Sequence, residues 1–167
     1  MRVRFKILTT LLEAVRNDLL RPHPFAAERV GFLSCRGASS SAGLVILVHS
    51  YHPVADLDYV DDRTVGAMMG PAAIRKALQL AYRDEVSIFH VHKHDHPGRT
   101  SFSSVDSRES AKFVPDFWNV QSELPHGAIV LSRDSAYGLC WHPGSPKPLP
   151  ITEFTFVGQP IVKVGSV

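Results

Sequence analysis

Two segments in the first third of the chain are almost continuously apolar, namely 29–35 (RVGFLSC) and 43–54 (GLVILVHSYHPV). Runs of this kind are typical of strands that are buried on both faces of a sheet, so other elements must cover both sides. Three segments with helical spacing or a helix-start signal supply that cover, at 10–21, 71–83 and 104–114. The Gly/Ser-rich stretch RGASSSAG is expected to form the turn between the two strands.

Further strand-like segments alternate with these helices along the chain. We expect them at 3–9, at 85–94, in a hairpin of HGAIVLSRD and AYGLCWHP around Asp134-Ser135, and at 151–158 (ITEFTFVG). Helices that alternate with strands predict an α/β fold, an α-β-α sandwich around a mixed β-sheet. With 167 residues, no internal repeat and no linker, the chain is expected to form a single domain over 1–167.

Charge, hydropathy and cysteine content argue against several classes of function. The net charge is +2, with acids and bases interspersed, which is too weak a bias for a nucleic-acid partner. The longest apolar run, 44–48, is too short to cross a membrane, and the first 20 residues are expected to be folded structure and not a signal peptide. Cys35 and Cys140 make no disulfide framework, so we expect a cytoplasmic protein.

The segment 89–98, FHVHKHDHPG, places four histidines at every second position. A strand sends residues i and i+2 to the same face, so these imidazoles point the same way for as long as the strand lasts. Two histidines at the end of a strand are a metal-ligand arrangement. They are equally typical of a wet face of a sheet, so the interpretation depends on what else completes a metal site.

A third ligand follows one loop later. In SSVD, Ser103 is expected to cap a helix whose first turn contains Asp106, where the helix dipole favours a charged carboxylate. His92, His94 and Asp106 would then hold one Zn²⁺ and leave its fourth position open for water. Two isolated cysteines cannot form a zinc finger, so any metal must be held by histidines and carboxylates.

A site that activates water also needs a base, and Glu28 is the candidate. It follows the Pro-rich stretch RPHPF and immediately precedes the apolar segment 29–35. A charged residue at that position is either exposed at the end of a strand or placed in a site. The residues alone leave both interpretations open.

Three pieces, AERVGFL (27–33), HVHKHDHP (90–97) and FSSVD (102–106), stand in an order that resembles the JAB/MPN (JAMM-motif) family of zinc metalloproteases, in particular bacterial deubiquitinase-like members. The resemblance implies a cytidine-deaminase-like JAB/MPN core. It also implies a peptidase or isopeptidase that cleaves after the C-terminus of a ubiquitin-like protein. In such an enzyme Glu28 is the general base, and Ser103 donates a hydrogen bond to the tetrahedral oxyanion.

The implied partners are a ubiquitin-like protein or its conjugates. Stand-alone bacterial members of the family are often encoded beside ubiquitin-activating-like enzymes, and some serve in antiviral defence against phage. The resemblance therefore extends the expected partners to activating-like and conjugating-like enzymes of such a system.

The register of the histidine ligands is open in one respect. The family pattern leaves ten residues between the second histidine and the aspartate. The pair His92 and His94 leaves eleven before Asp106, whereas His94 and His96 leave nine. The apolar residues before His92 place it inside the strand, which favours His92 and His94. His96 would then contact the substrate or lie behind the ligands.

Three other functions compete with this interpretation. A metallo-β-lactamase carries His-x-His-x-Asp-His, and the run here is one residue short of it, in a chain that is short for that fold. A non-catalytic scaffold of the MPN type would lack ligands, but all the functional positions are filled. A deaminase would need a Pro-Cys-x-x-Cys pair, whereas Cys35 and Cys140 are isolated.

Overall fold

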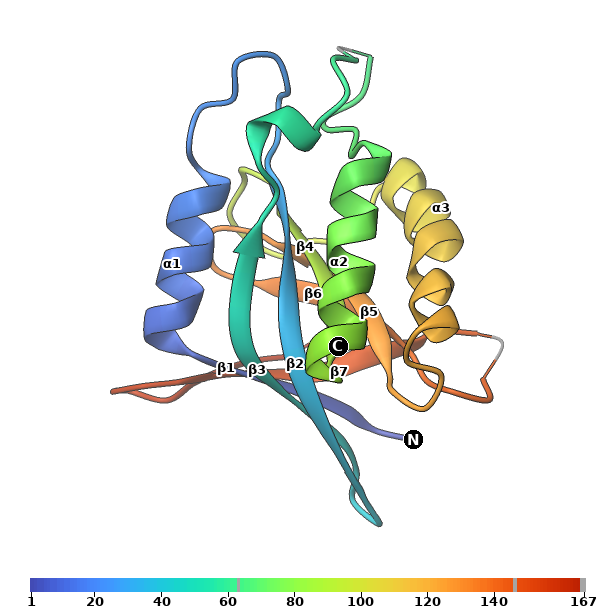
Figure 1. The fold of residues 1–167 in the computed structure, drawn as a ribbon. Coiled ribbons are helices and arrows are strands. Elements are labelled where there is room, and N and C mark those ends of the chain that lie inside the picture. The colour runs from blue at the N-terminus through green and yellow to red at the C-terminus, as the bar shows by residue number, and fades with distance from the viewer. Residues whose placement is uncertain (63, 146, 166–167) are drawn as a thin grey trace.

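The structure is a computed structural model that describes residues 1–62, 64–145 and 147–165. Figure 1 shows its helices and strands in the order of the chain. The elements are β1 (Val3–Leu8), α1 (Thr9–Leu19), β2 (Val30–Ser40), β3 (Gly43–Pro53), a 3-10 turn (Asp56–Asp58), α2 (Pro71–Asp84), β4 (Ser87–Lys93), α3 (Ser104–Phe113), a second 3-10 turn (Val114–Asn119), β5 (His126–Leu131), β6 (Ala136–Trp141), β7 (Leu149–Val157) and β8 (Val162–Val164).

Strands β1 to β7 form a closed ring in the order β1-β3-β2-β4-β5-β6-β7. The ring closes because β1 pairs in parallel with β3 along one edge and with β7 along the other. Strand β8 adds to the remaining edge of β7. The expected hairpin around Asp134-Ser135 is confirmed, since β5 and β6 pair antiparallel up to Leu131 and Ala136.

The expected α-β-α sandwich around a mixed β-sheet is wrong, and so is the cytidine-deaminase-like core that the resemblance implied. The described residues form a closed, seven-stranded mixed β-barrel with three α-helices. Closure depends on the pairing of β1 with β7, which are separated by almost the whole length of the chain. No local sequence pattern indicates such a pairing. A barrel strand that a helix covers on its outer face also has a continuous apolar sequence, as a sandwich strand does. The apolar runs therefore do not distinguish the two folds.

The Gly/Ser-rich stretch also differs from expectation. Arg36–Ser40 continue β2 and pair with Gly43–Leu47 of β3, so the turn itself is confined to residues 41–42. The side chains of 36–40 are exposed. Small polar residues are tolerated there because the end of the hairpin projects beyond the barrel (Figure 1) and residues 36–40 bury no side chain, whereas Leu44 and Ile46 on the paired strand β3 belong to the core.

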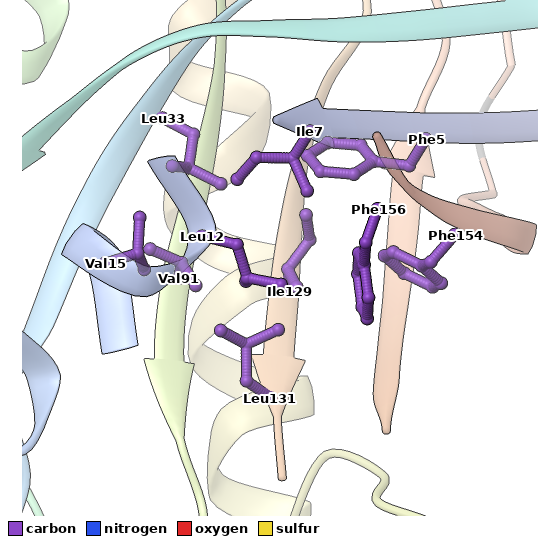
Figure 2. A pocket seen from close by; sticks show the side chains of 10 residues that line it. All are labelled: Phe5, Ile7, Leu12, Val15, Leu33, Val91, Ile129, Leu131, Phe154 and Phe156. Carbon is purple, nitrogen blue, oxygen red and sulfur yellow. The ribbon is translucent and has the colours of Figure 1, made fainter. Parts of the chain in front are cut away.

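The barrel interior is a filled apolar core. Residues of several strands and the α1 side chains Leu12, Val15 and Leu19 belong to one buried cluster. Figure 2 shows the small cavity that remains inside it, about 10 Å³ and lined only by apolar side chains. A cavity of this size is at the limit for one water molecule, and it offers no polar partner, so it is not a ligand site.

Helices α2 and α3 lie on the opposite side of β2 and β4 from α1 (Figure 1). The buried cluster beneath α2 includes Val30 and Phe32 of β2, Ile88 of β4 and Phe117 of the second 3-10 turn. Together α2, α3 and β4 leave a cleft on this outer side, described below. Within the described ranges, every helix is too short or too polar to cross a lipid bilayer.

His126 is a structural histidine at the start of β5. It is fully buried, accepts a hydrogen bond from the Ile88 N–H at 3.0 Å, and donates through Nε2 to the Gln121 carbonyl at 3.2 Å. Its ring stacks on Phe117 with a centroid separation of 5.2 Å. Burial lowers the pKa of His126 to about 4. Both nitrogens are therefore hydrogen-bonded within the core, and His126 has no nitrogen free to bind a metal.

This environment predicts an acid-dependent loss of stability. The unfolded chain protonates His126 near its ordinary pKa of 6.5, whereas the folded chain resists protonation down to about 4. The stabilisation is therefore complete above pH 6.5 and is lost as the pH falls toward 4, by on the order of 3 kcal/mol. Urea unfolding, with a chelator present to keep both proteins free of metal, measures the free energy of unfolding. Between about pH 7 and pH 4.5, this free energy should fall less for His126→Asn than for wild type. Equal losses in the two proteins would contradict the prediction.

Candidate metal centre

Strand β4 brings two imidazoles to the cleft. Strand β4 lies between β2 and β5, with His92 opposite Val30 on one side and Val130 on the other. The side chain of His92 is 3% exposed and that of His94 is 21% exposed. The His94 N–H donates to the Leu131 carbonyl at 2.9 Å, so pairing with β5 continues to this residue. Both backbones are thus fixed by neighbouring strands.

Helix α3 brings the carboxylate of Asp106. The expected cap is present in both directions: the Asp106 N–H donates to Ser103 Oγ at 3.1 Å, and the Ser103 N–H donates to Asp106 Oδ2 at 2.8 Å. The same Oδ2 lies 3.5 Å from Nε2 of His92 and 3.6 Å from Nε2 of His94. The adjacent His92 and the Ser103 bonds hold the pKa of the Asp106 carboxyl well below its usual range.

Glu28 reaches the same place from the loop before β2. Ligand atoms of Glu28, His92 and His94 all lie within 4.8 Å of one another. The Glu28 N–H donates to the Gly66 carbonyl at 2.9 Å. A Cβ added to Gly66 would lie 3.0 Å from the carboxylate carbon and 3.1–3.2 Å from its oxygens. The backbone at Gly66 therefore packs directly against the Glu28 carboxylate, and the half-buried acid faces the cleft.

His96 lies outside this group. It is exposed, its Nδ1 is 2.9 Å from the Pro97 carbonyl, and its ring centroid is 6.0 Å from that of His94. Of the two possible registers, the structure thus gathers the pair His92 and His94 around Asp106. The strand geometry explains this, because β4 ends at Lys93 and the chain turns away after His94.

The loop between the two ligand segments is tied to the β5–β6 turn. The Gly98 carbonyl accepts hydrogen bonds from the hydroxyls of Ser132 at 2.8 Å and Ser135 at 2.7 Å. The Gly98 N–H donates to Asp134 at 2.6 Å. Gly98 has a φ of +82°, which favours glycine. These four residues were not predicted to support the site, since sequence shows only a turn at 132–135.

A cleft of about 590 Å³ surrounds the ligand atoms, which is within the range of small-molecule and peptide sites. Apolar side chains of the 65–69 segment, α2 and α3 line it together with the histidines. The lining residues are Glu28, Val30, Thr64, Val65, Gly66, Ala67, Met68, Met69, Ile74, His90, His92, His94, Ser103, Val105, Asp106, Arg108, Glu109, Ser110 and Phe113. Burial and the neighbouring His92 lower the pKa of His90 to about 3, so its imidazole is neutral.

Two observations indicate that the donor atoms of His92, His94 and Asp106 fit zinc. Both nitrogens of His92 are buried without a hydrogen-bond partner among the described residues, and coordination would occupy Nε2. Zinc–ligand bonds of about 2.0–2.1 Å in a tetrahedron place neighbouring donors roughly 3.3–3.4 Å apart. The separations of 3.5 and 3.6 Å between Asp106 Oδ2 and the two imidazole nitrogens are close to that value.

No family model and no curated protein matches this sequence. The functional interpretation therefore depends on the motif pieces and on the geometry of the cleft.

Proposed function

We propose that this chain is a zinc-dependent peptidase or isopeptidase that cleaves after the C-terminus of a ubiquitin-like protein. The observation that supports the proposal most is the convergence of His92, His94 and Asp106, with Glu28 beside them, in one cleft. Two imidazoles and a carboxylate are the donor set of a catalytic zinc that keeps a position for water. We further propose a cytoplasmic location, supported by two cysteines that are free and buried.

Each residue has a role that follows from its position. Zinc, when bound, supplies a Lewis acid that polarises a carbonyl and acidifies a water molecule. Glu28 accepts the proton of that water and later delivers it to the leaving amine, which is a backbone amine or a lysine side chain. The Ser103 hydroxyl accepts the Asp106 N–H, so its own proton is free to donate to the developing oxyanion.

The choice of a ubiquitin-like substrate is supported by the resemblance of the three motif pieces to JAB/MPN proteases and by a cleft of about 590 Å³ beside the candidate ligands. Activating-like and conjugating-like enzymes of a conjugation system used in antiviral defence are the proposed further partners. The alternative is a non-catalytic scaffold, which would bind such a partner without metal and would be indifferent to changes at Glu28.

The proposal is tested by incubating the purified chain with two substrates, a ubiquitin-like protein fused to a C-terminal extension and the same protein joined to a lysine side chain. We expect cleavage at the C-terminus of the ubiquitin-like part with zinc, and loss of cleavage after chelation that added zinc reverses. A chain that contains about one zinc but cleaves neither substrate would refute the substrate class, and a chain that binds no zinc would refute the metal site.

Ser103→Ala provides a separate prediction. It removes a cap worth about 1 kcal/mol and, on the proposed mechanism, the oxyanion donor, whose loss costs about 100-fold or more in kcat. Ser103→Thr keeps both the cap and the hydroxyl and is expected to retain most activity. Zinc content should be unchanged in both variants. A lower melting temperature in Ser103→Ala with an unaltered kcat would limit Ser103 to its structural role.

A further inference from the structure

We propose that Arg29 is a positioning residue that, together with Asp56, fixes the backbone of Glu28 so that its carboxylate faces the two histidines. The inference rests on the proposed function for its catalytic consequence, because a displaced Glu28 matters only if Glu28 acts as the base. Its structural part concerns a network of hydrogen bonds among residues that do not line the cleft, and it can be tested by itself.

Arg29 is the residue next to Glu28, and its side chain is only 3% exposed. The guanidinium donates in three directions: from Nε to the Arg21 carbonyl at 2.9 Å, from Nη2 to the Pro22 carbonyl at 2.7 Å, and from Nη1 to Asp56 Oδ1 at 2.6 Å. It thus ties the loop that leaves α1 and the 3-10 turn after β3 to the residue adjacent to Glu28.

His23 folds the same loop around this point. Its Nδ1 accepts the N–H groups of Phe25 at 3.3 Å and Ala26 at 3.0 Å, which leaves the ring proton on Nε2. That Nε2 lies 4.0 Å from Asp56 Oδ1, the oxygen that also accepts from Arg29. The ring packs edge-on against Phe25 and Tyr59. The chain from Pro22 to Arg29 is therefore held at both ends and along its length.

Glu28 is fixed from its other side as well. Its N–H donates to Gly66, while the next strand residue, Val30, donates its N–H to the Tyr59 hydroxyl at 2.8 Å. With Arg29 between these two bonds, the backbone at Glu28 has anchors before, at and after it. The carboxylate has one remaining freedom, its own side-chain rotation, which Gly66 restricts.

Burying a charge as deeply as that of Arg29 has a large desolvation cost. An apolar side chain of similar size would avoid the desolvation cost and is often neutral or stabilising at such positions. It would not, however, satisfy the carbonyls of Arg21 and Pro22, and it would not attract Asp56. Arg29 therefore selects one conformation of the loop, and the part of that conformation that faces the cleft is Glu28.

The test compares Arg29→Lys and Asp56→Asn with a matched control, Asp84→Asn. Lysine keeps the charge but loses the planar fork that reaches three acceptors. Asp56 is half-exposed, so its asparagine variant keeps the fold even if the arginine variant does not. Asp84 also accepts from an arginine, Arg83, at 2.7 Å, but the pair is exposed at the end of α2. The readouts are amide hydrogen exchange at Glu28, zinc content, and kcat and KM on the ubiquitin-like fusion.

We expect both variants to speed exchange of the Glu28 amide at least about 10-fold, without a change at the barrel amides of β4. The value of kcat should fall about 10-fold to 100-fold, the loss that a displacement of about 1 Å produces, while KM and zinc content stay within about twofold of wild type. The control should match wild type in all of these. Unchanged exchange at Glu28 overturns the inference, and so does faster exchange with an unchanged kcat.

Failure of the proposed function gives a different result. In that case wild type itself lacks zinc or does not cleave the fusion, while amide exchange at Glu28 still responds to Arg29→Lys and Asp56→Asn. The exchange measurement therefore decides whether Arg29 fixes Glu28, and the comparison of kcat values among zinc-loaded proteins decides whether this position matters for catalysis.

Discussion

Glu28→Gln is expected to keep about one zinc per chain and to lower kcat for cleavage of a ubiquitin-like fusion by about a hundredfold to ten-thousandfold. Glutamine has the same shape as glutamate and preserves the contact with Gly66, but it cannot accept the proton of the attacking water. Zinc content by elemental analysis and steady-state kinetics measure the two effects on the same preparation. Because KM reports on binding and the proposed role of Glu28 is on the water, KM should change little.

The control for this variant is Glu109→Gln. Glu109 lines the rim of the same cleft, but its carboxylate is bonded to Lys112 at 2.9 Å and to Arg108 at 3.1 Å and is half-exposed. We expect nearly wild-type activity. The Glu28 carboxylate belongs to the same cluster as the imidazoles, with ligand atoms within 4.8 Å of one another, so the experiment also tests a second role. Loss of zinc from Glu28→Gln would make Glu28 a ligand, and full activity would remove it as the base.

Alanine at His92, His94 or Asp106 is expected to weaken zinc binding by a hundredfold or more, whereas His96→Ala should bind zinc as wild type does. Structural zinc sites in proteins are worth about 10–16 kcal/mol, so the loss of one of a few donors removes several kcal/mol. Zinc titration against a competing chelator measures the affinities, and cleavage of the fusion should disappear with the metal.

Folding must be separated from metal binding in this series. Asp106→Ala also breaks the cap of α3, so Asp106→Asn, which retains an acceptor for the Ser103 N–H, is the matched variant. It should keep the melting temperature of the metal-free protein and still lose zinc. If His96→Ala loses zinc and His92→Ala keeps it, the ligands are His94 and His96 and the proposed pair is wrong.

The local elements could be predicted because their signals are local. The helix 71–83 corresponds to Pro71–Asp84, with Pro71 in its first turn, and the cap of α3 by Ser103 is present as the sequence indicated. The spacing of the histidines also predicted that His92 and His94 point the same way, and the structure brings both imidazoles to the same Asp106 oxygen, with His92 near the end of β4 and His94 just beyond it.

The architecture was predicted incorrectly because it depends on pairings between distant strands. Residues 3–9 were expected to form a strand, but their pattern does not reveal that this strand pairs with both β3 and β7 and closes the sheet. For the same reason the sequence did not identify Gly66, Arg29 or the turn at 132–135 as supports of the site. Gly66 contacts Glu28, Arg29 contacts Asp56, and the turn at 132–135 contacts Gly98, and the members of each pair are far apart in the chain.

The sequence by itself determined which donors the chain carries and which local element presents each of them: two imidazoles at a strand end, a carboxylate in a capped first turn, and an acid before a buried strand. Only the tertiary structure decided that these elements meet, that Glu28 lies beside the imidazoles and does not point into bulk solvent, and that the sheet closes. The physical reason is that backbone conformation and side-chain direction are set by neighbours within a few residues. The position of one segment against another is set by hydrogen bonding and packing that involve the whole chain.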